Sequence, residues 1–346
     1  MQIKISSLLV QNGGALKDVK IDFTDTTGQP QQVTVLGGAN GSGKTTVLEL
    51  IFALVELFKF SPTTDLTSID NNIQAILKRT EYAELELLID NEKCQVFSDK
   101  PRFPYSDANL HHDKHGIIWQ EFYSNARIWH LQYSSKSKKM AEQIRLNQGK
   151  SLNFLDSPSE SVPANTIPSI LYFPHHRELQ PVEGEQIYRE DVKYQWCYRY
   201  LTGFDFQGSL ESYLIWLDYA DKPMFELVID FLNQLNFEGK TFHINRKQLS
   251  VVVKTREGSE HPLIQLSSGE QNILILLLEL RRRLLPGSIV LIDEIENSLH
   301  PEFQHRFAKN LARLQKQIPF QLILTTHQYA FVKIFGEPCT RLLTEF

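Results

Sequence analysis

Hydrophobic and polar positions along the chain form patterns that predict strands and helices in succession. Val33 and Val35 in "QQVTVLGG" indicate a strand that ends in glycines, and the next stretch, "TTVLELIFALVELFKF", has apolar residues at helical spacing. Further along, the pattern predicts a helix over 270–284, the strand "SIVLID", a helix over 301–316, the strand "FQLILTT" and another helix. Such alternation is typical of a mainly parallel sheet covered by helices, so we expect an α/β fold.

The sequence between these two regions is less regular. Residues 82–98 predict a hairpin around Asp90 and Asn91, and "SILYF" (169–173) predicts a short buried strand stopped by Pro174. The polar stretch between them is expected to form loops with one strand at "ARIWHLQY". Residues 185–236 read as mainly helical, and "FHINRKQLSVVVKTREGSEHPLIQL" returns to strands. We expect three parts: a discontinuous core (1–100, 166–177 and 262–346), a polar insertion (101–165) and a helical lobe (178–261).

Composition excludes several classes of protein. With 42% hydrophobic and 22% charged residues, the 346-residue chain is not of the disordered or fibrous class. Its net charge of -5 requires any nucleic-acid contact to come from a local patch. Cys94, Cys197 and Cys339 lie far apart without CxxC spacing, which favours free thiols in a reducing compartment. The N-terminus reads as a strand rather than a cationic leader, and no apolar run approaches the ~18 residues of a membrane span. We therefore expect a cytoplasmic protein with no membrane partner.

The first stretch with clear chemistry is a glycine-rich turn between the first predicted strand and helix. Residues 38–45, "GANGSGKT", fit the pattern GxxxxGK[ST]. Glycines let the backbone fold around a triphosphate so that its N–H groups and the following helix N-terminus point at the anion. Lys44 would then lie along the β- and γ-phosphates, and the Thr45 hydroxyl would bind Mg²⁺. The residues expected to bind ATP are Asn40, Gly41, Ser42, Gly43, Lys44, Thr45 and Thr46.

Two strand ends carry further candidate groups. The apolar strand "IVLI" ends in Asp293 and Glu294, and the strand "QLILTT" ends in His327. Parallel strands end together at the edge where ligands bind in open α/β folds. We expect Asp293 to hold Mg²⁺ through water and Glu294 to polarise the water that attacks the γ-phosphate. His327 would contact that phosphate or orient the water. Taken singly, each strand end is more often an ordinary solvated feature.

Taken together and in this order, the phosphate loop, "LSSGE", "LIDE" followed by "IENSLHP", and "TTH" resemble an ABC-type ATPase of the soluble branch. This branch comprises the RecF/SMC-like and OLD-like "AAA-family" ATPases of DNA repair and phage defence. The resemblance implies a P-loop head with a mainly parallel sheet, an N-terminal antiparallel β-subdomain and a helical lobe. It also implies that the "LSSGE" signature contacts ATP held by a partner subunit, in a homodimer or higher oligomer. The signature residues are Ser267, Ser268, Gly269 and Glu270.

Differences between this sequence and related classes of ATPase exclude some of the alternatives within the resemblance. The loop "ENSLHP" resembles the soluble branch rather than transporter subunits, and residues 178–262 are too few for the long coiled coil of SMC proteins. The residues after His327 are also too few for the nuclease domain of OLD proteins. No Gln stands in "LYFPHHREL", where the family places its glutamine loop, so His175, His176 and Arg177 are candidate replacements.

The expected function is an ATP-binding and hydrolysing dimeric switch. Its nucleotide state would control an effector such as a nuclease or toxin, as in phage defence, with DNA as a further candidate partner. The alternative is a nucleotide-sensing scaffold that binds ATP with little turnover and acts through oligomerisation. Steady-state ATPase measurements, with and without DNA, separate the two.

Three other clusters have simpler interpretations. His111, His112 and His115 lack a Cys or carboxylate that would complete a metal site, so a solvated loop is favoured. The lysines of the polar insertion could contact nucleic acid, but solvation of the insertion is favoured; they are Lys136, Lys138, Lys139 and Lys150. The arginines at 281–283 end a predicted helix, whose dipole they would complement.

Overall fold

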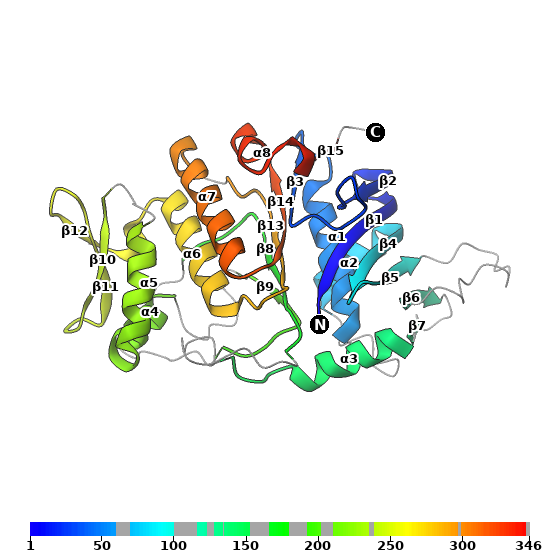
Figure 1. Ribbon diagram of the computed structural model, residues 1–346, viewed down its shortest axis with the longest axis horizontal. Helices are drawn as coiled ribbons and strands as arrows, with labels where there is room; N and C mark the ends of the chain where they lie inside the picture. Colours follow the sequence, from blue (N-terminus) through cyan, green and yellow to red (C-terminus); the bar gives the residue numbers. More distant parts are fainter. Residues whose placement is uncertain are drawn as a thin grey trace.

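Two β-sheets lie on either side of one buried helix in this computed structural model (Figure 1). It describes residues 1–59, 70–99, 116–122, 128–133, 135–152, 166–179, 192–201, 210–234, 239–296 and 299–343. In these residues the first sheet has the order β2-β1-β4-β5-β6-β7. Its strands are β1 (Ile3–Gly13), β2 (Leu16–Asp22), β4 (Thr80–Ile89), β5 (Glu92–Asp99), β6 (Gly116–Phe122) and β7 (Ile128–Tyr133). Neighbouring strands are antiparallel except β5 and β6.

The hairpin predicted around Asp90 and Asn91 is confirmed. These two residues join β4 to β5, which pair from Ile89 with Glu92 onwards. Both turn residues have positive φ, 47° and 63°. This conformation suits the twist of a two-residue hairpin, and Asp and Asn tolerate it better than most residues do.

The second sheet is parallel throughout the described residues, in the order β15-β3-β14-β13-β8-β9. Its strands are β3 (Val33–Gly38), β8 (Ile170–Phe173), β9 (Cys197–Arg199), β13 (Ile289–Ile292), β14 (Gln321–Thr326) and β15 (Thr340–Leu343). Every residue of β8, β13 and β14 is buried. Both faces of these strands are covered, which explains why they read as continuous apolar runs rather than as alternating ones. The expected α/β fold with a parallel sheet is confirmed.

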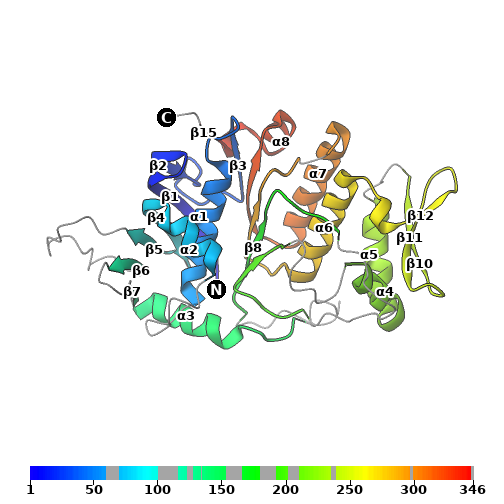
Figure 2. The same ribbon diagram turned by 180° about the vertical axis from the view of Figure 1, so that it is seen from behind.

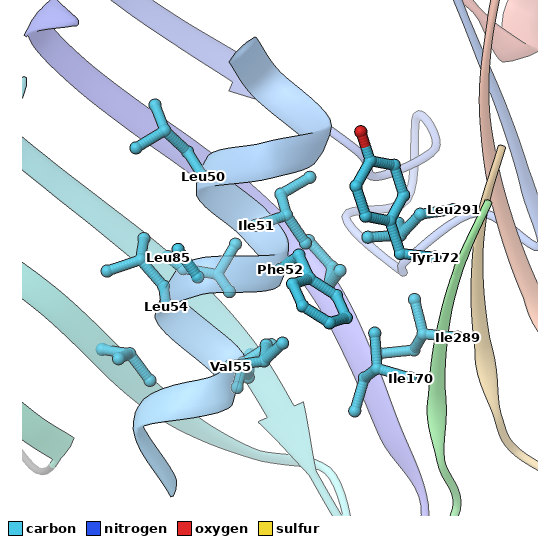
Figure 3. Packing of buried hydrophobic residues seen from close by; sticks show 14 of the residues in the cluster. Leu50, Ile51, Phe52, Leu54, Val55, Leu85, Ile170, Tyr172, Ile289 and Leu291 are labelled. Atoms are coloured by element: carbon cyan, nitrogen blue, oxygen red, sulfur yellow. The ribbon is translucent and has the colours of Figure 1, made fainter. Parts of the chain in front are cut away.

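Alternate residues of β13 point into two separate hydrophobic cores, one on each side of the parallel sheet. Ile289 and Leu291 of β13 face α1 (Lys44–Glu56), which packs between the two six-stranded sheets, as Figure 3 shows. Val290 and Ile292 face the opposite way, toward α6 (Ser268–Arg283) and α7 (Pro301–Gln317). In Figure 2 both helices lie on the side of the sheet away from α1. The strand period of two residues thus fixes which side of the sheet each helix covers.

The remaining elements lie around these layers. Two helices, α4 (Leu210–Ala220) and α5 (Lys222–Gln234), and a three-stranded antiparallel sheet form the end of the molecule beyond α6 (Figures 1 and 2). The strands of that sheet are β10 (Thr241–Asn245), β11 (Ser250–Lys254) and β12 (Glu260–Pro262). Shorter helices are α2 (Asn71–Lys78), α3 (Ser135–Asn147) and α8 (Tyr329–Phe335). None of the helices in the described residues is both long and apolar enough to cross a membrane.

Residues 101–165 hold more regular structure than expected. Besides the strand predicted at "ARIWHLQY", which is β7, they contribute β6 and α3. Strand β6 pairs with the edge of β5, so this segment extends the first sheet instead of only forming loops. Met140, Ala141 and Ile144 anchor α3 and are almost fully buried. The many lysines around these three residues hide the short apolar stripe from a reading of the sequence.

The arginine run that ends α6 also differs from expectation. Arg282 and Arg283 are buried and form ion pairs with Glu279, at 2.9 and 2.6 Å. A favourable interaction with the helix dipole is therefore not a sufficient explanation for them. They belong to the second hydrophobic core, where each guanidinium also stacks on a tyrosine ring.

Candidate nucleotide-binding site

The glycine-rich loop joins β3 to α1 at the carboxyl edge of the parallel sheet. Gly41 and Gly43 have φ values of 81° and 90°, which favour glycine. A Cβ atom at Gly43 would lie 2.6 Å from a methyl carbon of Leu16, and one at Gly38 would lie 2.6 Å from the carbonyl oxygen of Leu343. The loop is thus packed too tightly for side chains at these two positions.

Lys44 is folded back into this loop. Its ammonium donates to the carbonyl oxygens of Gly38, at 2.9 Å, and Ala39, at 2.7 Å. Burial lowers the pKa of Lys44, and the carboxylates of Glu294 and Asp293 act in the opposite direction. Lys44 therefore lies within the field of the acidic strand end, although the two are far apart in the sequence.

The side chain of Ser42 faces into the same loop. Its hydroxyl is buried and has no hydrogen-bond partner within the described residues. Asn40 and Gly41, by contrast, are exposed at the loop surface. A buried hydroxyl without a partner is costly to leave unsatisfied, so this loop is suited to a polar ligand.

Asp293 lies at the centre of the strand ends. It follows β13 directly and is fully buried. One carboxylate oxygen, Oδ2, accepts a hydrogen bond from the Thr45 hydroxyl at 2.9 Å. The other, Oδ1, accepts one from the Thr325 hydroxyl at 2.6 Å. The structure therefore brings together the two residues that the sequence assigned to the metal, Thr45 and Asp293.

Glu294 and His327 meet at the next position along this edge. The His327 Nε2 atom lies 3.9 Å from a carboxylate oxygen of Glu294, and both side chains are partly exposed. Glu294 has a φ of 44°, a conformation that is rare for a residue other than glycine. Its backbone N–H donates to the Thr325 hydroxyl at 2.7 Å, which holds it in place. The backbone N–H of His327 donates to the Glu296 carboxylate.

The three candidates for the glutamine-loop position have different environments. His175 Nδ1 lies 3.6 Å from Asp293 Oδ2, whereas His176 Nε2 lies 3.5 Å from Glu178. Arg177 is buried and donates to the carbonyl oxygens of Pro174, Asp293 and Glu294, at 2.6, 2.9 and 3.1 Å. Of the three, only His175 approaches the carboxylate of Asp293.

The signature residues form the start of α6. Ser267 and Glu270 make a capping box, in which the Ser267 N–H donates to Glu270 Oε2 at 2.9 Å. Glu270 is buried and pairs with Lys240 at 2.7 Å. Ser267 and Ser268 are exposed. Within the described residues, no hydrogen bond or ion pair joins this turn to the phosphate loop of residues 38–45.

Two contributors to the site were missed in the sequence. Thr325 lies inside the "TTH" motif, but only His327 of that motif was assigned a role. Arg177 was considered only as a replacement for glutamine, yet it joins two loops of the site to Asn272 of α6. The sequence alone carries no signal for Thr325, because its place beside Asp293 depends on the register between β13 and β14.

The donor set fits a magnesium ion bound together with a nucleotide. In the described part of the chain, no group of three or more His, Cys, Asp and Glu side chains could hold a metal. Mg²⁺ keeps several waters and is usually bound through one or two carboxylates plus the phosphates of its substrate. Thr45 and Asp293 supply two such oxygen donors beside the phosphate loop.

The remaining clusters add little to this site. His111, His112 and His115 lie outside the described residues. Lys138, Lys139 and Lys150 are exposed, as expected for a solvated surface.

Comparison with known proteins identifies the family. A family model described as "AAA ATPase domain" matches residues 3–198, more than half of the chain. A second, described as "AAA domain, putative AbiEii toxin, Type IV TA system", matches residues 213–333. The curated protein "Retron Ec83 probable ATPase" of Escherichia coli is 42% identical over 76 residues, which cover 19% of this chain and 14% of that protein. The chain therefore matches only a small part of that relative's length.

Solved structures with a similar arrangement include an SMC head domain from Thermotoga maritima, with a TM-score of 0.45 and 14% identity over 96% of this chain and 92% of that chain. A dimeric bacterial ABC transporter cassette has a TM-score of 0.38 and 15% identity over 99% of this chain and 94% of that chain. The match over residues 3–198 is the one that decides membership. The chain belongs to the AAA ATPase domain family.

Proposed function

We propose that this chain binds MgATP between the glycine-rich loop and the acidic strand end, and hydrolyses it. One observation carries the proposal: side chains from three strand ends and one helix start converge at a single edge of the parallel sheet. The Thr45 hydroxyl donates a hydrogen bond to the Asp293 carboxylate, and the His327 ring lies beside the Glu294 carboxylate. The family to which the chain belongs supports the same activity.

Each residue has a role that its position supports. Lys44 would exchange the two carbonyl oxygens that it now contacts for phosphate oxygens. Thr45 and Asp293 would hold Mg²⁺, which neutralises charge on the phosphates when it is bound. Glu294 is exposed enough to reach a water molecule and accept its proton, and His327 is placed to donate a hydrogen bond to that water or to the γ-phosphate.

Steady-state ATPase and calorimetric titration test this proposal directly. Lys44→Ala should lose most nucleotide affinity, because the loop loses its only described cation. Glu294→Gln should keep nucleotide affinity but lose turnover by about 10²-fold to 10⁴-fold, the usual contribution of a general base. Exposed residues provide matched controls, Lys17→Ala and Glu257→Gln, which should behave as wild type. Wild-type turnover in Glu294→Gln would contradict the catalytic assignment, and very low turnover in the wild type would favour a nucleotide-sensing scaffold.

We further propose that two copies of the chain form the active unit, each providing the signature turn for the other's nucleotide. Among the described residues, no hydrogen bond joins this turn to the phosphate loop of its own chain, and this supports the proposal. Ser267 and Ser268 are exposed at the first turn of α6. The exposed hydroxyls at this helix N-terminus can donate to a phosphate of a second copy, beside the Glu270 carboxylate that accepts from the Ser267 N–H.

We propose a role in defence, in which the nucleotide state controls a partner protein such as a nuclease or toxin. The support is the name of the curated relative, a probable retron ATPase, and the AbiEii description of the second family model. DNA is a further candidate partner. Phage challenge of cells that carry this gene with its neighbouring genes tests the role. Protection should require both Lys44 and Glu294, and equal protection by Lys44→Ala would contradict it.

A further inference from the structure

The loop after β8 brings a histidine to the same carboxylate oxygen that Thr45 contacts. Strands β8 and β13 are parallel neighbours, with Phe173 opposite Ile292, so the residues that follow them emerge side by side. His175 Nδ1 lies 3.6 Å from Asp293 Oδ2, and the Thr45 hydroxyl donates to that atom at 2.9 Å. One nitrogen and two oxygen donors therefore converge where the nucleotide's cation is expected.

The separation between His175 and Asp293 fits two ligands of one ion better than a direct bond. At 3.6 Å it exceeds the normal length of a hydrogen bond. Two donors that each bind an ion at about 2.1 Å lie roughly 3 Å apart when they are neighbours in an octahedron. A small movement of the exposed His175 side chain would bring its Nδ1 atom to that separation from Asp293 Oδ2. The adjacent His176 is directed to Glu178 instead.

We propose that His175 is a nitrogen ligand of the divalent cation that enters with the nucleotide. Mn²⁺ and Mg²⁺ both take mainly oxygen donors, but Mn²⁺, as a transition metal, accepts an imidazole nitrogen more readily than Mg²⁺ does. The site would then prefer Mn²⁺ over Mg²⁺ more strongly than a site made only of oxygen donors does. This inference rests on the proposed nucleotide site, because phosphates and water must supply the remaining ligands.

Pulsed electron paramagnetic resonance tests the ligand directly. The full chain is prepared with ¹⁵N-labelled histidine and loaded with Mn²⁺ and the slowly hydrolysed analogue ATPγS. The ¹⁵N label distinguishes the signal of a histidine nitrogen from that of a nucleotide nitrogen. We expect a ¹⁵N coupling to Mn²⁺ in the wild type and in His176→Gln, and its loss in His175→Gln. Bound Mn²⁺ without this coupling in the wild type, or a coupling that persists in His175→Gln, would overturn the inference.

Competition between the two cations provides a second readout. His175→Gln should lower the preference for Mn²⁺ over Mg²⁺, because it removes the nitrogen ligand, and His176→Gln should leave this preference unchanged. An unchanged preference in His175→Gln would count against the ligand role. Failure of the underlying nucleotide site looks different: the wild type would then bind Mn²⁺ and ATPγS no better than Lys44→Ala does. Both histidines are largely exposed, so these substitutions leave the fold intact.

Discussion

At the scale of single residues, the hydroxyl of Thr325 connects the two acidic side chains that end β13. It donates to Asp293 and accepts the backbone N–H of Glu294. The strained backbone of Glu294, with its φ of 44°, depends on such contacts, because a conformation of this kind costs about 1–3 kcal/mol. Thr325 therefore acts on the geometry of the site without needing to contact the nucleotide.

Thr325→Val should weaken both the fold and the proposed reaction. Valine keeps the shape of threonine but removes the hydroxyl that bonds to the buried Asp293 carboxylate and the partly buried Glu294 N–H, at a cost of about 1–3 kcal/mol. Denaturant unfolding measures the first effect and single-turnover hydrolysis the second. Thr325→Ser, which retains the hydroxyl, is the matched control. Equal stability of the valine and serine variants would show that the hydroxyl does not hold the strand end.

The sequence could predict most of this site but not Thr325. Asp293, Glu294 and His327 stand out because polar residues follow apolar strands. A threonine inside a buried strand, by contrast, looks like an ordinary strand former. Only the register between β13 and β14, in which Ile292 lies opposite Leu324, shows that Thr325 faces Asp293.

At the scale of elements, α6 carries a buried charge cluster near its C-terminal end. Burial alone would raise the pKa of Glu279, but the guanidinium groups of Arg283 and Arg282 outweigh it and hold this pKa at about 2. The folded-state pKa lies below the unfolded one. The carboxylate therefore stabilises the fold fully above about pH 4.5, and this contribution is lost as the pH falls toward 2.

Glu279→Gln should remove this pH dependence and destabilise the fold near neutral pH. Glutamine removes the carboxylate that pairs with two buried guanidinium groups, and breaking a buried ion pair costs about 3–5 kcal/mol. Urea unfolding from pH 7 to pH 3 should show a steeper loss of stability below pH 4.5 in the wild type than in the variant. Parallel pH profiles for the two proteins would contradict the assignment of this titration to Glu279.

Arg177 joins three elements of the core. It donates to Asn272 of α6 and to the carbonyl oxygens of Asp293 and Glu294. Burial lowers its pKa to about 10, which still leaves it charged at neutral pH. Lysine cannot reproduce the planar fork of donors, so a change here would disturb the position of Asp293 and Glu294 relative to α6.

Arg177→Lys should reduce ATP turnover more than ATP affinity, because the phosphate loop itself is untouched. Measured kcat should fall by at least about tenfold, which corresponds to ~1.4 kcal/mol of activation free energy. The dissociation constant for ATP should change much less. Arg313→Lys, on the exposed face of α7, is the control. A change in affinity with unchanged kcat would show that Arg177 acts on binding instead.

Elements with a long, strong pattern were predictable, and short edge strands were not. Helix α6 and strands β13 and β14 follow from apolar periodicity because each buries one or both faces in a core. Strand β9 has three residues and β15 has four, and both lie at the edges of the parallel sheet. Their pairing depends on the neighbouring strand, so their own residues carry little signal.

At the scale of the whole molecule, the dimer proposal predicts that two inactive variants can restore each other. Lys44→Ala disables the phosphate loop. Ser268→Asp places a carboxylate where the signature turn would meet the partner's γ-phosphate and repel it. Because Ser268 is exposed in the first turn of α6, where an acidic residue is favourable, this change should not disturb the fold.

A mixed dimer of these variants has one site with both defects and one site with neither. With equal amounts and free exchange, half of the dimers are mixed and half of their sites are intact, so recovery reaches about a quarter of wild-type activity. Activity is measured before and after mixing, and tagged pull-down verifies exchange. If the turn acts within its own chain, every site keeps a defect, and no activity returns despite exchange.

The Lys44 ammonium donates to the carbonyl oxygens of Gly38 and Ala39, which ties the glycine-rich loop to the first turn of α1. The loop is wrapped around its own cation, so its shape does not have to wait for a triphosphate to arrive. Nucleotide binding, as proposed, would exchange these two neutral oxygens for charged phosphate oxygens, and release would reverse the exchange. In the proposed function, Lys44 would therefore have hydrogen-bond partners both before a nucleotide binds and after it leaves.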